Sequence, residues 1–480
     1  MNITLMSLRL ILSIFVIVWP DALIANISSC DDQNLYRTLS SSTNQYVMAD
    51  LLFARQEPNK NSKILSYLKQ GQKIKLANEP KVFENDRLWT KIKFPSSTEA
   101  KLTGWVDSNY LSKNPLRHLS NIEKYKNIDF EFDEKVCAHK NNPRRKVRGI
   151  YLTMYSAFGK HLDRFLQLAN RSSINSFVVD YKDELGKIIF KSETVKKMNP
   201  VQAKRVLIKD PKTLPERTKL ENIYLIGKLV VFKDDSYARQ FPASAIKHKD
   251  GRLFEDRDGI AWVNPYNREY WNYVLGIAEE MARSGVNEIQ FDYIRFPDTN
   301  KPLLMSAEEK RARVEVIHEF LKEAYKRLKP HGVYVSADVF GLVPNTAGDL
   351  YIGQHWESLS SVIDYISPMM YPSHYSKGFA SIKDPDMNPY DTIYHSARGA
   401  VNRSQKMTQP ATIRPWIQGF TATWLRSHIK YGQTELQAQI DALASLGVDE
   451  YLIWNPGNRY ENLLKQESNV SIDVADSASN

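Results

Sequence analysis

The chain has 480 residues, of which 42% are hydrophobic and 25% are charged, and its formal net charge is +10. This length exceeds that of a typical single domain, and the hydrophobic share is that of a globular protein with a large core. The basic residues are scattered and form no recognisable nucleic-acid-binding module, so the charge does not indicate nucleic acid as a partner.

The first 25 residues have the layout of a secretory signal peptide. Arg9 precedes an apolar run at 10–19, and smaller residues follow it. The run is shorter than the roughly 20 residues that span a bilayer. We therefore expect cleavage near Ala25 and a secreted, periplasmic or envelope protein with no stable membrane span. An uncleaved membrane anchor is the alternative.

Two cysteines are present, Cys30 and Cys137, and both follow the expected cleavage site. In an oxidising compartment an even pair can form a disulfide, which here would close a loop around the first domain. Two unpaired thiols are the alternative.

Residues 46–113 predict a small all-β unit. Short apolar stretches alternate with turn residues, and strands are expected at 73–78, 88–94 and 103–111. The segments "ARQEPNKNSKILSYLKQGQKI", "WTKI" and "GWVDSNYL" resemble a bacterial SH3-like domain. The resemblance implies an envelope-associated protein whose small domain binds wall peptide or glycan, with a structural spacer as the alternative.

Residues 114–146 are polar and charged and are predicted to be a linker, and residues 464–480 lack apolar periodicity and are predicted to be a disordered tail. Between them, apolar stretches alternate with helical patterns at 159–172, 268–285, 308–330 and 434–447. The apolar stretches predict strands at 147–153, 176–183, 224–232, 287–296, 333–341, 364–371, 414–420 and 450–456.

Eight strands alternating with helices over 147–463 predict a parallel (β/α)₈ TIM barrel. A doubly wound open sheet is the alternative, but no glycine-rich phosphate loop follows the first strand. In a TIM barrel the active site lies at the carboxyl ends of the strands. Reactive side chains at these ends are therefore the candidate site residues.

Period-two alternation in "EIQFD" and "YVSAD" directs Asp292 and Asp338 into the barrel from neighbouring strands. Adjacent strands lie about 4.8 Å apart, so the two carboxyl groups can approach the ~5–5.5 Å separation of a retaining glycosidase. One would attack the anomeric carbon. The other, with a pKa raised by its neighbour's charge, would protonate the leaving oxygen.

Aromatic rings near the strand ends suit the flat faces of sugars, and Arg295 suits a carboxylate or other polar group of the substrate. Core packing is the alternative for each aromatic residue, and an ion pair with Asp292 is the alternative for Arg295. For Asp180 and Asp183 the alternative is helix capping or a loop ion pair. The predicted substrate-binding residues are Asp180, Lys182, Asp234, Tyr293, Arg295, Tyr371, Trp416 and Trp454, with Trp262 as a further aromatic candidate.

The segments "FDYIRFP", "VVDYKDELG", "KLVVFKD", "SADVFG", "SPMMYPSHY" and "WIQGF" look like those of a bacterial family of glycosyl hydrolase domains with largely unassigned substrates. The resemblance covers most of 147–460 and implies a TIM barrel. It places the nucleophile on Asp292 and the acid/base on Asp338, where related barrels often have glutamate. Asp180 or Asp234 remain alternatives for the acid/base. Lys228 stands where the pattern has arginine.

Other chemistries have less support. There is no "HExxH" motif, no Cys/His cluster and no "GxSxG" elbow, so neither zinc nor a serine nucleophile is expected. A cation held by Asp180, Asp183 and Asp234 stays open, although no cofactor is predicted. The sequence thus predicts an exported glycoside hydrolase acting on an envelope or extracellular polysaccharide such as a peptidoglycan-like glycan. A non-catalytic glycan-binding envelope protein is the alternative.

Overall fold

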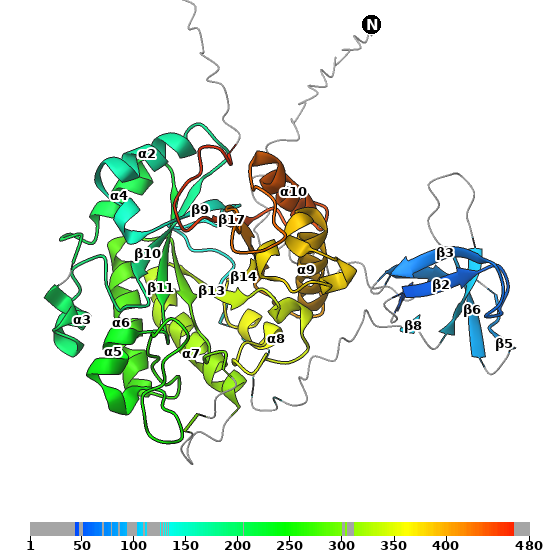
Figure 1. The fold of residues 1–480 in the computed structure, drawn as a ribbon, viewed down its shortest axis with the longest axis horizontal. Coiled ribbons are helices and arrows are strands. Elements are labelled where there is room, and N and C mark those ends of the chain that lie inside the picture. The colour runs from blue at the N-terminus through cyan, green and yellow to red at the C-terminus, as the bar shows by residue number, and fades with distance from the viewer. Residues whose placement is uncertain are drawn as a thin grey trace, which may run out of the picture.

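A computed structural model shows two separate β-sheets, one in the N-terminal quarter and one in the remainder of the chain (Figure 1). It describes residues 44–112 with gaps at 48–50, 70–71, 78, 85–86, 94–102 and 109–110. It also describes positions 125, 128, 130 and 132, and residues 134–464 except 205, 300–302 and 305–311. The predicted signal peptide, Cys30 and the tail after 464 lie outside the described residues, so cleavage and the disulfide stay predictions.

The N-terminal sheet is antiparallel, with the strand order β3-β2-β7-β6-β4-β1-β8 and with β5 paired to β6. Its strands alternate inward apolar and outward polar residues, and Leu52, Ile74, Ile92 and Val106 form a small core of their own. The predicted small all-β unit is therefore present. Its strands are β1 (Asn44–Val47), β2 (Leu51–Arg55), β3 (Ile64–Lys69), β4 (Lys73–Leu76), β5 (Val82–Glu84), β6 (Arg87–Lys93), β7 (Thr103–Asp107) and β8 (Leu111–Ser112).

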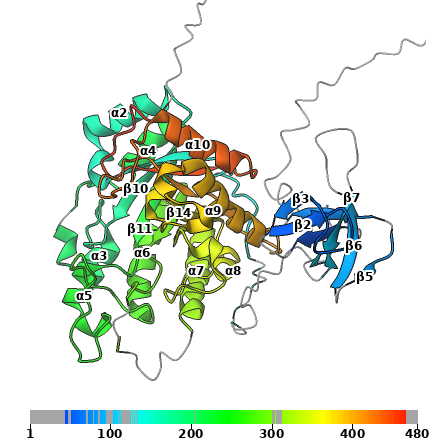
Figure 2. The same ribbon diagram turned by 45° about the vertical axis from the view of Figure 1, so that its right-hand side comes forward.

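The second sheet is a closed ring of parallel strands, so the predicted (β/α)₈ barrel is confirmed (Figures 1 and 2). Pairing of β13 with β14 closes it, and β15 and β16 both pair with β14 and share the seventh position. The strands are β9 (Arg148–Leu152), β10 (Ser176–Lys182), β11 (Tyr224–Val230), β12 (Glu288–Asp292), β13 (Tyr334–Phe340), β14 (Tyr365–Met370), β15 (Thr412–Ile413), β16 (Trp416–Gln418) and β17 (Tyr451–Trp454).

Helices surround the ring, and the four predicted ones are confirmed as α2 (Gly159–Ala169), α6 (Arg268–Ser284), α7 (Arg313–Leu328) and α10 (Gln433–Ala444). The sequence analysis missed α9 because its polar residues and its proline obscure the apolar periodicity. It also missed four shorter helices. The helices that were not predicted are α3 (Glu193–Met198), α4 (Thr213–Leu220), α5 (Asp235–Gln240), α8 (Trp356–Ser360) and α9 (Pro389–Ser404).

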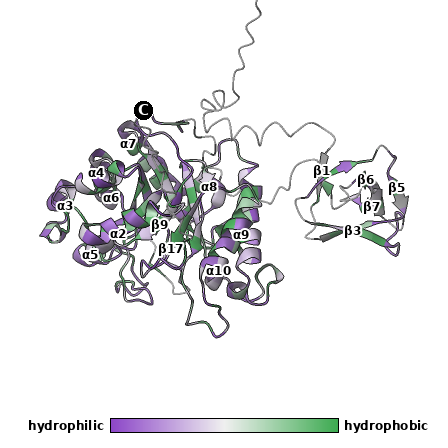
Figure 3. Ribbon diagram, turned by 90° about the horizontal axis from the view of Figure 1, so that it is seen from above, coloured by the Kyte–Doolittle hydropathy of each residue, from purple (hydrophilic) through white to green (hydrophobic). Residues whose placement is uncertain are grey.

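Outward-facing strand residues and the inner faces of the helices form the main core. Phe291 of β12 is fully buried, and its ring centroid lies 5.5 Å from that of Phe320 on α7. Inward residues follow the opposite parity, as in the hydrogen bond from Gln290 to the Ser367 hydroxyl across the ring. Figure 3 shows the hydrophobic colour along the barrel strands and much hydrophilic colour on the outer helices. The alternation predicted for the fourth strand is therefore correct.

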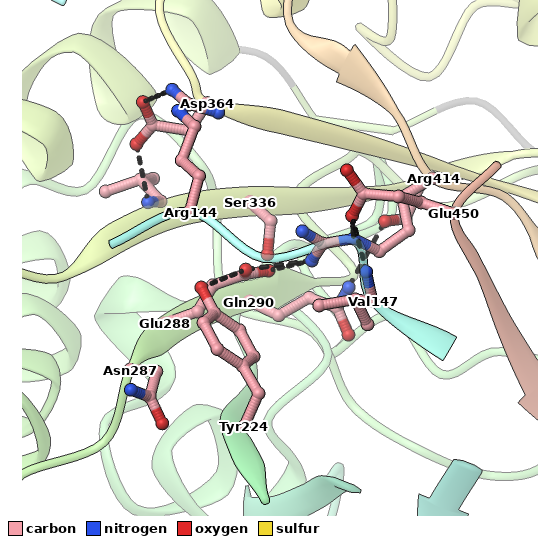
Figure 4. Close-up of polar contacts among 12 residues, drawn as sticks. Arg144, Val147, Tyr224, Asn287, Glu288, Gln290, Ser336, Asp364, Arg414 and Glu450 are labelled. Carbon is pink, nitrogen blue, oxygen red and sulfur yellow. Dashed lines mark hydrogen bonds and ion pairs between the residues drawn. The ribbon is translucent and has the colours of Figure 1, made fainter. Parts of the chain in front are cut away.

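A buried ion network fills the amino-terminal end of the barrel (Figure 4). Both oxygens of Glu288 accept hydrogen bonds from Nη1 of Arg414, at 2.9 and 2.8 Å, and Nε of Arg414 donates to Glu450 at 2.9 Å. The Tyr224 hydroxyl donates to Glu288 at 3.0 Å, and the Arg414 guanidinium stacks 3.6 Å from the centroid of the Tyr365 ring. Every one of these charges has an opposite partner, which a buried charge requires.

Part of the predicted linker packs on this amino-terminal end. The Arg144 guanidinium forms an ion pair with Asp364 at 2.9 Å and lies 4.9 Å from the centroid of the Tyr334 ring (Figure 4). The Asn142 side chain donates to the carbonyl oxygens of Asn287 and Gly332 at 2.7 and 3.0 Å. The segment just before the first barrel strand therefore belongs to the barrel fold.

Within the described part of the chain, none of the helices combines the length and the apolar character needed to cross a membrane.

Candidate active site

A cavity of about 360 Å³ opens where the barrel strands end at their carboxyl side. Its walls combine acidic, basic and aromatic side chains. Strand residues that line it include Asp180, Lys228, Asp292, Asp338, Trp416 and Trp454. The structure thus brings both predicted catalytic carboxylates into one cavity.

Asp292 is the last residue of β12, and both of its carboxylate oxygens have hydrogen-bond donors. Oδ1 accepts from the backbone N–H of Tyr293 at 2.7 Å, and Oδ2 lies 3.0 Å from Nζ of Lys228. Tyr293 has a φ of 50°, a left-handed conformation that is disfavoured for an aromatic residue. The strained turn thus lies at the residue whose N–H holds the carboxylate, as expected for a functional site.

Lys228 of β11 links two carboxylates. Its Nζ lies 2.9 Å from Oδ1 of Asp180 and 3.0 Å from Oδ2 of Asp292. Burial acts to lower the pKa of Lys228, but the charges of Asp180 and Asp292 outweigh this effect and raise that pKa well above its ordinary value. The Tyr151 hydroxyl donates to the second oxygen of Asp180. Tyr151, Asp180, Lys228 and Asp292 therefore form one continuous polar chain on the cavity wall.

Asp338 of β13 lies in a different environment. Its side chain is 2% exposed, and Oδ1 accepts a hydrogen bond from the indole Nε1 of Trp416 at 2.7 Å. Burial, and then the negative charge of Asp292, raise the pKa of Asp338 well above its ordinary value, while Lys228 and the Trp416 hydrogen bond act in the opposite direction. Asp338 is thus favoured as the protonated member of the pair.

The strand register places the two carboxylates side by side. Phe291 pairs with Ala337, so the next residues, Asp292 and Asp338, are neighbours near the carboxyl ends of adjacent strands. One carboxyl group is buried and has a raised pKa, and the other faces a lysine. This is the combination that acid-assisted cleavage of a glycosidic bond requires.

Aromatic side chains form another part of the cavity wall. The rings of Tyr371 and Trp454 stack with their centroids 5.0 Å apart, and Trp416 forms the wall beside Asp338. These three residues therefore line the cavity, and their predicted contact with substrate stays a prediction.

Arg295 also lines the cavity, and its expected alternative, an ion pair with Asp292, does not occur. The guanidinium lies 5.1 Å from the ring centroids of both Trp262 and Tyr293, and Nη1 donates to the carbonyl oxygen of Phe296 at 3.1 Å. Burial lowers its pKa, with Tyr293 and Asp292 acting in the opposite direction. Trp262 itself is buried behind Arg295, 2% exposed, and donates its indole N–H to Asp256.

Lys182 and Asp234, both predicted to bind substrate, do not line the cavity. They form a buried ion pair at 2.9 Å, in which Lys182 also donates to the carbonyl oxygen of Val230 at 2.8 Å. Asp234 caps α5 by accepting the N–H of Tyr237 at 3.0 Å. The prediction is wrong for Lys182 because the strand register shifts between Asp180 and Lys182, a β-bulge that redirects the later side chain. It is wrong for Asp234 because that side chain caps α5 and pairs with Lys182.

The aspartates proposed as an alternative cation site also do not come together. Asp183 accepts backbone N–H groups of Leu185 and Lys187 in a turn, whereas Asp234 pairs with Lys182. Among the described residues, no group of three or more histidine, cysteine, aspartate or glutamate side chains is placed to hold a metal ion.

Several cavity residues were missed in the sequence. Tyr151 follows the inward parity of the first strand, so alternation was a usable signal for it. Lys228 was noted in the sequence only as standing where the pattern has arginine, and its place inside an apolar strand was a further sign of a buried partner. Arg257, Gln354 and Tyr375 come from loops, where no periodicity indicates the direction of a side chain.

Among solved structures, a hypothetical protein from Ruminiclostridium thermocellum is 34% identical over 40% of this chain and 97% of its own, with a TM-score of 0.35. The glycoside hydrolase domain of PgaB (BpsB) from Bordetella bronchiseptica is 14% identical over 65% and 94% of the two chains, with a TM-score of 0.45. The α-galactosidase TtGalA from Thermus thermophilus is 12% identical over 82% and 73%, with a TM-score of 0.41.

A search of curated proteins finds no match. Residues 149–460 include strands β10 to β17, most of β9, and the cavity residues Asp180, Asp292 and Asp338. They match the model of the family described as "Putative glycosyl hydrolase domain", and the chain belongs to this family.

Proposed function

We propose that this protein is an exported glycoside hydrolase that cleaves an envelope or extracellular polysaccharide. The observation that carries the proposal is the pair of neighbouring inward aspartates with opposite surroundings. Asp338 is buried, and burial and the charge of Asp292 raise its pKa, whereas Asp292 faces Lys228 and a backbone N–H.

In this mechanism Asp338 donates its proton to the glycosidic oxygen as the bond from that oxygen to the anomeric carbon breaks. Asp292 stabilises the positive charge that develops on the sugar, either through space or by forming a glycosyl ester. Water then attacks the anomeric carbon, and a carboxylate accepts its proton. NMR of the first-formed anomer distinguishes the retaining from the inverting course.

The test is the Asp292→Asn variant, which removes the anionic charge and preserves the shape of the side chain. Reducing ends released from peptidoglycan glycan strands, glycol chitin, alginate and dextran are measured for both proteins. We expect wild-type turnover on at least one polymer and a loss of roughly 10³-fold or more in the variant, on the scale of other catalytic-residue substitutions.

The matched control is Asp183→Asn, because Asp183 directly follows β10, another barrel strand, but its Oδ1 accepts the N–H groups of a turn. An asparagine can accept the same backbone hydrogen bonds, so this variant should keep full activity. Turnover by Asp292→Asn at the wild-type rate would reject the assignment. Binding of a polymer with no release of ends by the wild type would favour the non-catalytic glycan-binding protein.

Export and wall binding are separate parts of the proposal. The signal-peptide pattern supports export, and the mass of the mature protein from a secreting host, with and without reductant, tests cleavage near Ala25 and the Cys30–Cys137 bridge. An intact N-terminus or two free thiols would contradict the respective expectation. The small antiparallel sheet supports an SH3-like wall-binding domain, tested by co-sedimentation of residues 26–113 with insoluble peptidoglycan.

A further inference from the structure

A row of aromatic side chains leads from the cavity wall to the exposed indole of Trp424. Trp454, which stacks on Tyr371 in the cavity, lies 5.2 Å from the ring centroid of Phe420. Phe420 in turn stacks on Trp424, with centroids 5.8 Å apart and planes inclined by 20°. The side chain of Trp424 is 63% exposed, so the aromatic surface is continuous from the catalytic pair to solvent.

Trp424 is held in position by its loop. The loop follows β16, the seventh barrel strand, and so lies on the face where the cavity opens. The Tyr431 hydroxyl donates to the carbonyl oxygen of Asp386 at 3.0 Å. The backbone N–H of Tyr431 donates to Thr421 Oγ1 at 3.0 Å. Ala422 is fully buried beneath the loop. The exposure of the indole is therefore a property of an anchored segment.

A single exposed apolar side chain is common on protein surfaces and needs no explanation. Trp424 differs because its ring continues an aromatic wall that begins at the cavity and because its edge contacts His374, another cavity residue, at a centroid distance of 6.2 Å. A rigid, flat, amphipathic ring in such a position presents a large contact area at little entropic cost. The apolar face of a pyranose ring fits this surface.

We propose that Trp424 forms an outer subsite that stacks on a sugar unit of the glycan beyond those held in the cavity. This inference rests on the proposed function and extends it, because it assigns the substrate class as a long polysaccharide chain. A short oligosaccharide that fills only the cavity does not reach the indole. Contact with Trp424 therefore selects for chain length through binding and leaves the chemistry at Asp292 and Asp338 unchanged.

The test measures binding in the Asp292→Asn background, in which the polymer stays intact. Affinity gel electrophoresis in gels containing glycol chitin, alginate, dextran or peptidoglycan glycan strands gives the dissociation constant for each polymer. We expect at least one polymer to retard the protein. Adding Trp424→Ala should weaken that binding by about threefold to tenfold, the value of one aromatic stacking contact. Trp424→Phe should stay within about twofold because a ring remains.

The matched control is Leu220→Ala, which removes an apolar side chain that is 81% exposed at the end of α4, before β11 and so at the opposite end of the barrel. It should leave binding unchanged. Disaccharide fragments of the retarding polymer should bind the Trp424→Ala protein and its parent equally. Three results would overturn the subsite. Trp424→Ala could weaken the binding of disaccharide and polymer equally, it could leave polymer binding unchanged, or none of the polymers could retard the protein.

These outcomes separate the two proposals. If Trp424→Ala weakens polymer binding but the wild type releases no ends from the same polymer, the subsite stands and the hydrolase assignment fails. If the wild type hydrolyses polymer and disaccharide-length substrates and Trp424→Ala changes neither rate, the hydrolase assignment stands and the subsite fails.

Discussion

Lys228 lies between two carboxylates that would otherwise repel each other in the cavity wall. Its Nζ lies within 3.0 Å of both Asp180 and Asp292, and its side chain is 12% exposed. At a low effective dielectric, the positive charge of this lysine interacts strongly with the charges of the neighbouring carboxylates. The ionisation of the catalytic pair therefore depends on a residue that itself need not touch the breaking bond.

We predict that Lys228→Met lowers kcat by roughly 10²-fold or more, as does the loss of other preorganised electrostatic groups. The positive charge of Lys228 lowers the pKa of Asp338, so its removal raises that pKa further. A general acid works while protonated, and activity falls as pH rises through its pKa. The alkaline limb of the kcat/KM profile should therefore move to higher pH.

The control is Lys377→Met, which removes an exposed lysine, 70% exposed, from an ion pair with Asp384. Its profile should match the wild type. An alkaline limb that stays in place or moves to lower pH in Lys228→Met would contradict the role of Asp338 as the acid.

At the residue scale, alternation along the strands located the acidic side chains but not their partners. Asp292 and Asp338 follow the period of two in regular strands, so the sequence was sufficient for them. Lys182 follows a β-bulge, and a bulge leaves no clear mark in a single sequence. Lys228 meets Asp180 and Asp292 only because β11 lies between β10 and β12 in the ring.

At the scale of elements, long periodic segments were predicted well. The helix α6 begins after Asn267, whose side chain accepts the N–H of Tyr270, and ends at Gly285, whose φ is 107°. Both ends carry standard capping residues. The seventh strand was predicted at 414–420, which contains β16, but β15 lies before that stretch and was missed. The two short strands are separated by Arg414 and Pro415, and Pro415 lacks the N–H that a strand ladder uses.

The end of α6 allows a stability prediction. Gly285→Ala forces a side chain into the left-handed region, which costs about 1–2 kcal/mol. Gly348→Ala is the control, because a Cβ at that position meets no atom within 4 Å and its backbone is not left-handed. Thermal unfolding should show a lower Tm for Gly285→Ala and no change for Gly348→Ala. Equal Tm values for both variants would contradict the capping role.

At the scale of the whole molecule, the segment that precedes the first barrel strand covers the amino-terminal end of the barrel. Arg144 lies outside the ring of strands and neutralises Asp364, whose side chain is fully buried. Burial raises the pKa of Asp364, and Arg144 is the largest influence in the opposite direction. Together with the Glu288–Arg414–Glu450 network, Arg144 satisfies the charges buried at the amino-terminal end.

We predict that Arg144→Met destabilises the protein by about 3–5 kcal/mol, because it leaves the Asp364 carboxylate buried without its partner. The adjacent Arg145 is a matched control, since its Nη1 reaches only the exposed carbonyl oxygen of Asn222 at 2.9 Å. Arg145→Met should unfold like the wild type. Chemical denaturation of the three proteins measures the difference in the free energy of unfolding. Equal midpoints would show that the segment before β9 does not stabilise the barrel.

The sequence by itself determined the barrel, its strands, and the two aspartates near the carboxyl ends of the fourth and fifth strands, because periodicity and strand ends are local properties of the chain. Only the tertiary structure decided that Lys228 joins Asp180 to Asp292, that Arg144 seals the amino-terminal end, and that Trp424 extends the aromatic wall. Each of these contacts joins side chains from different strands or loops. Ring closure and strand register, which no local pattern encodes, bring them together.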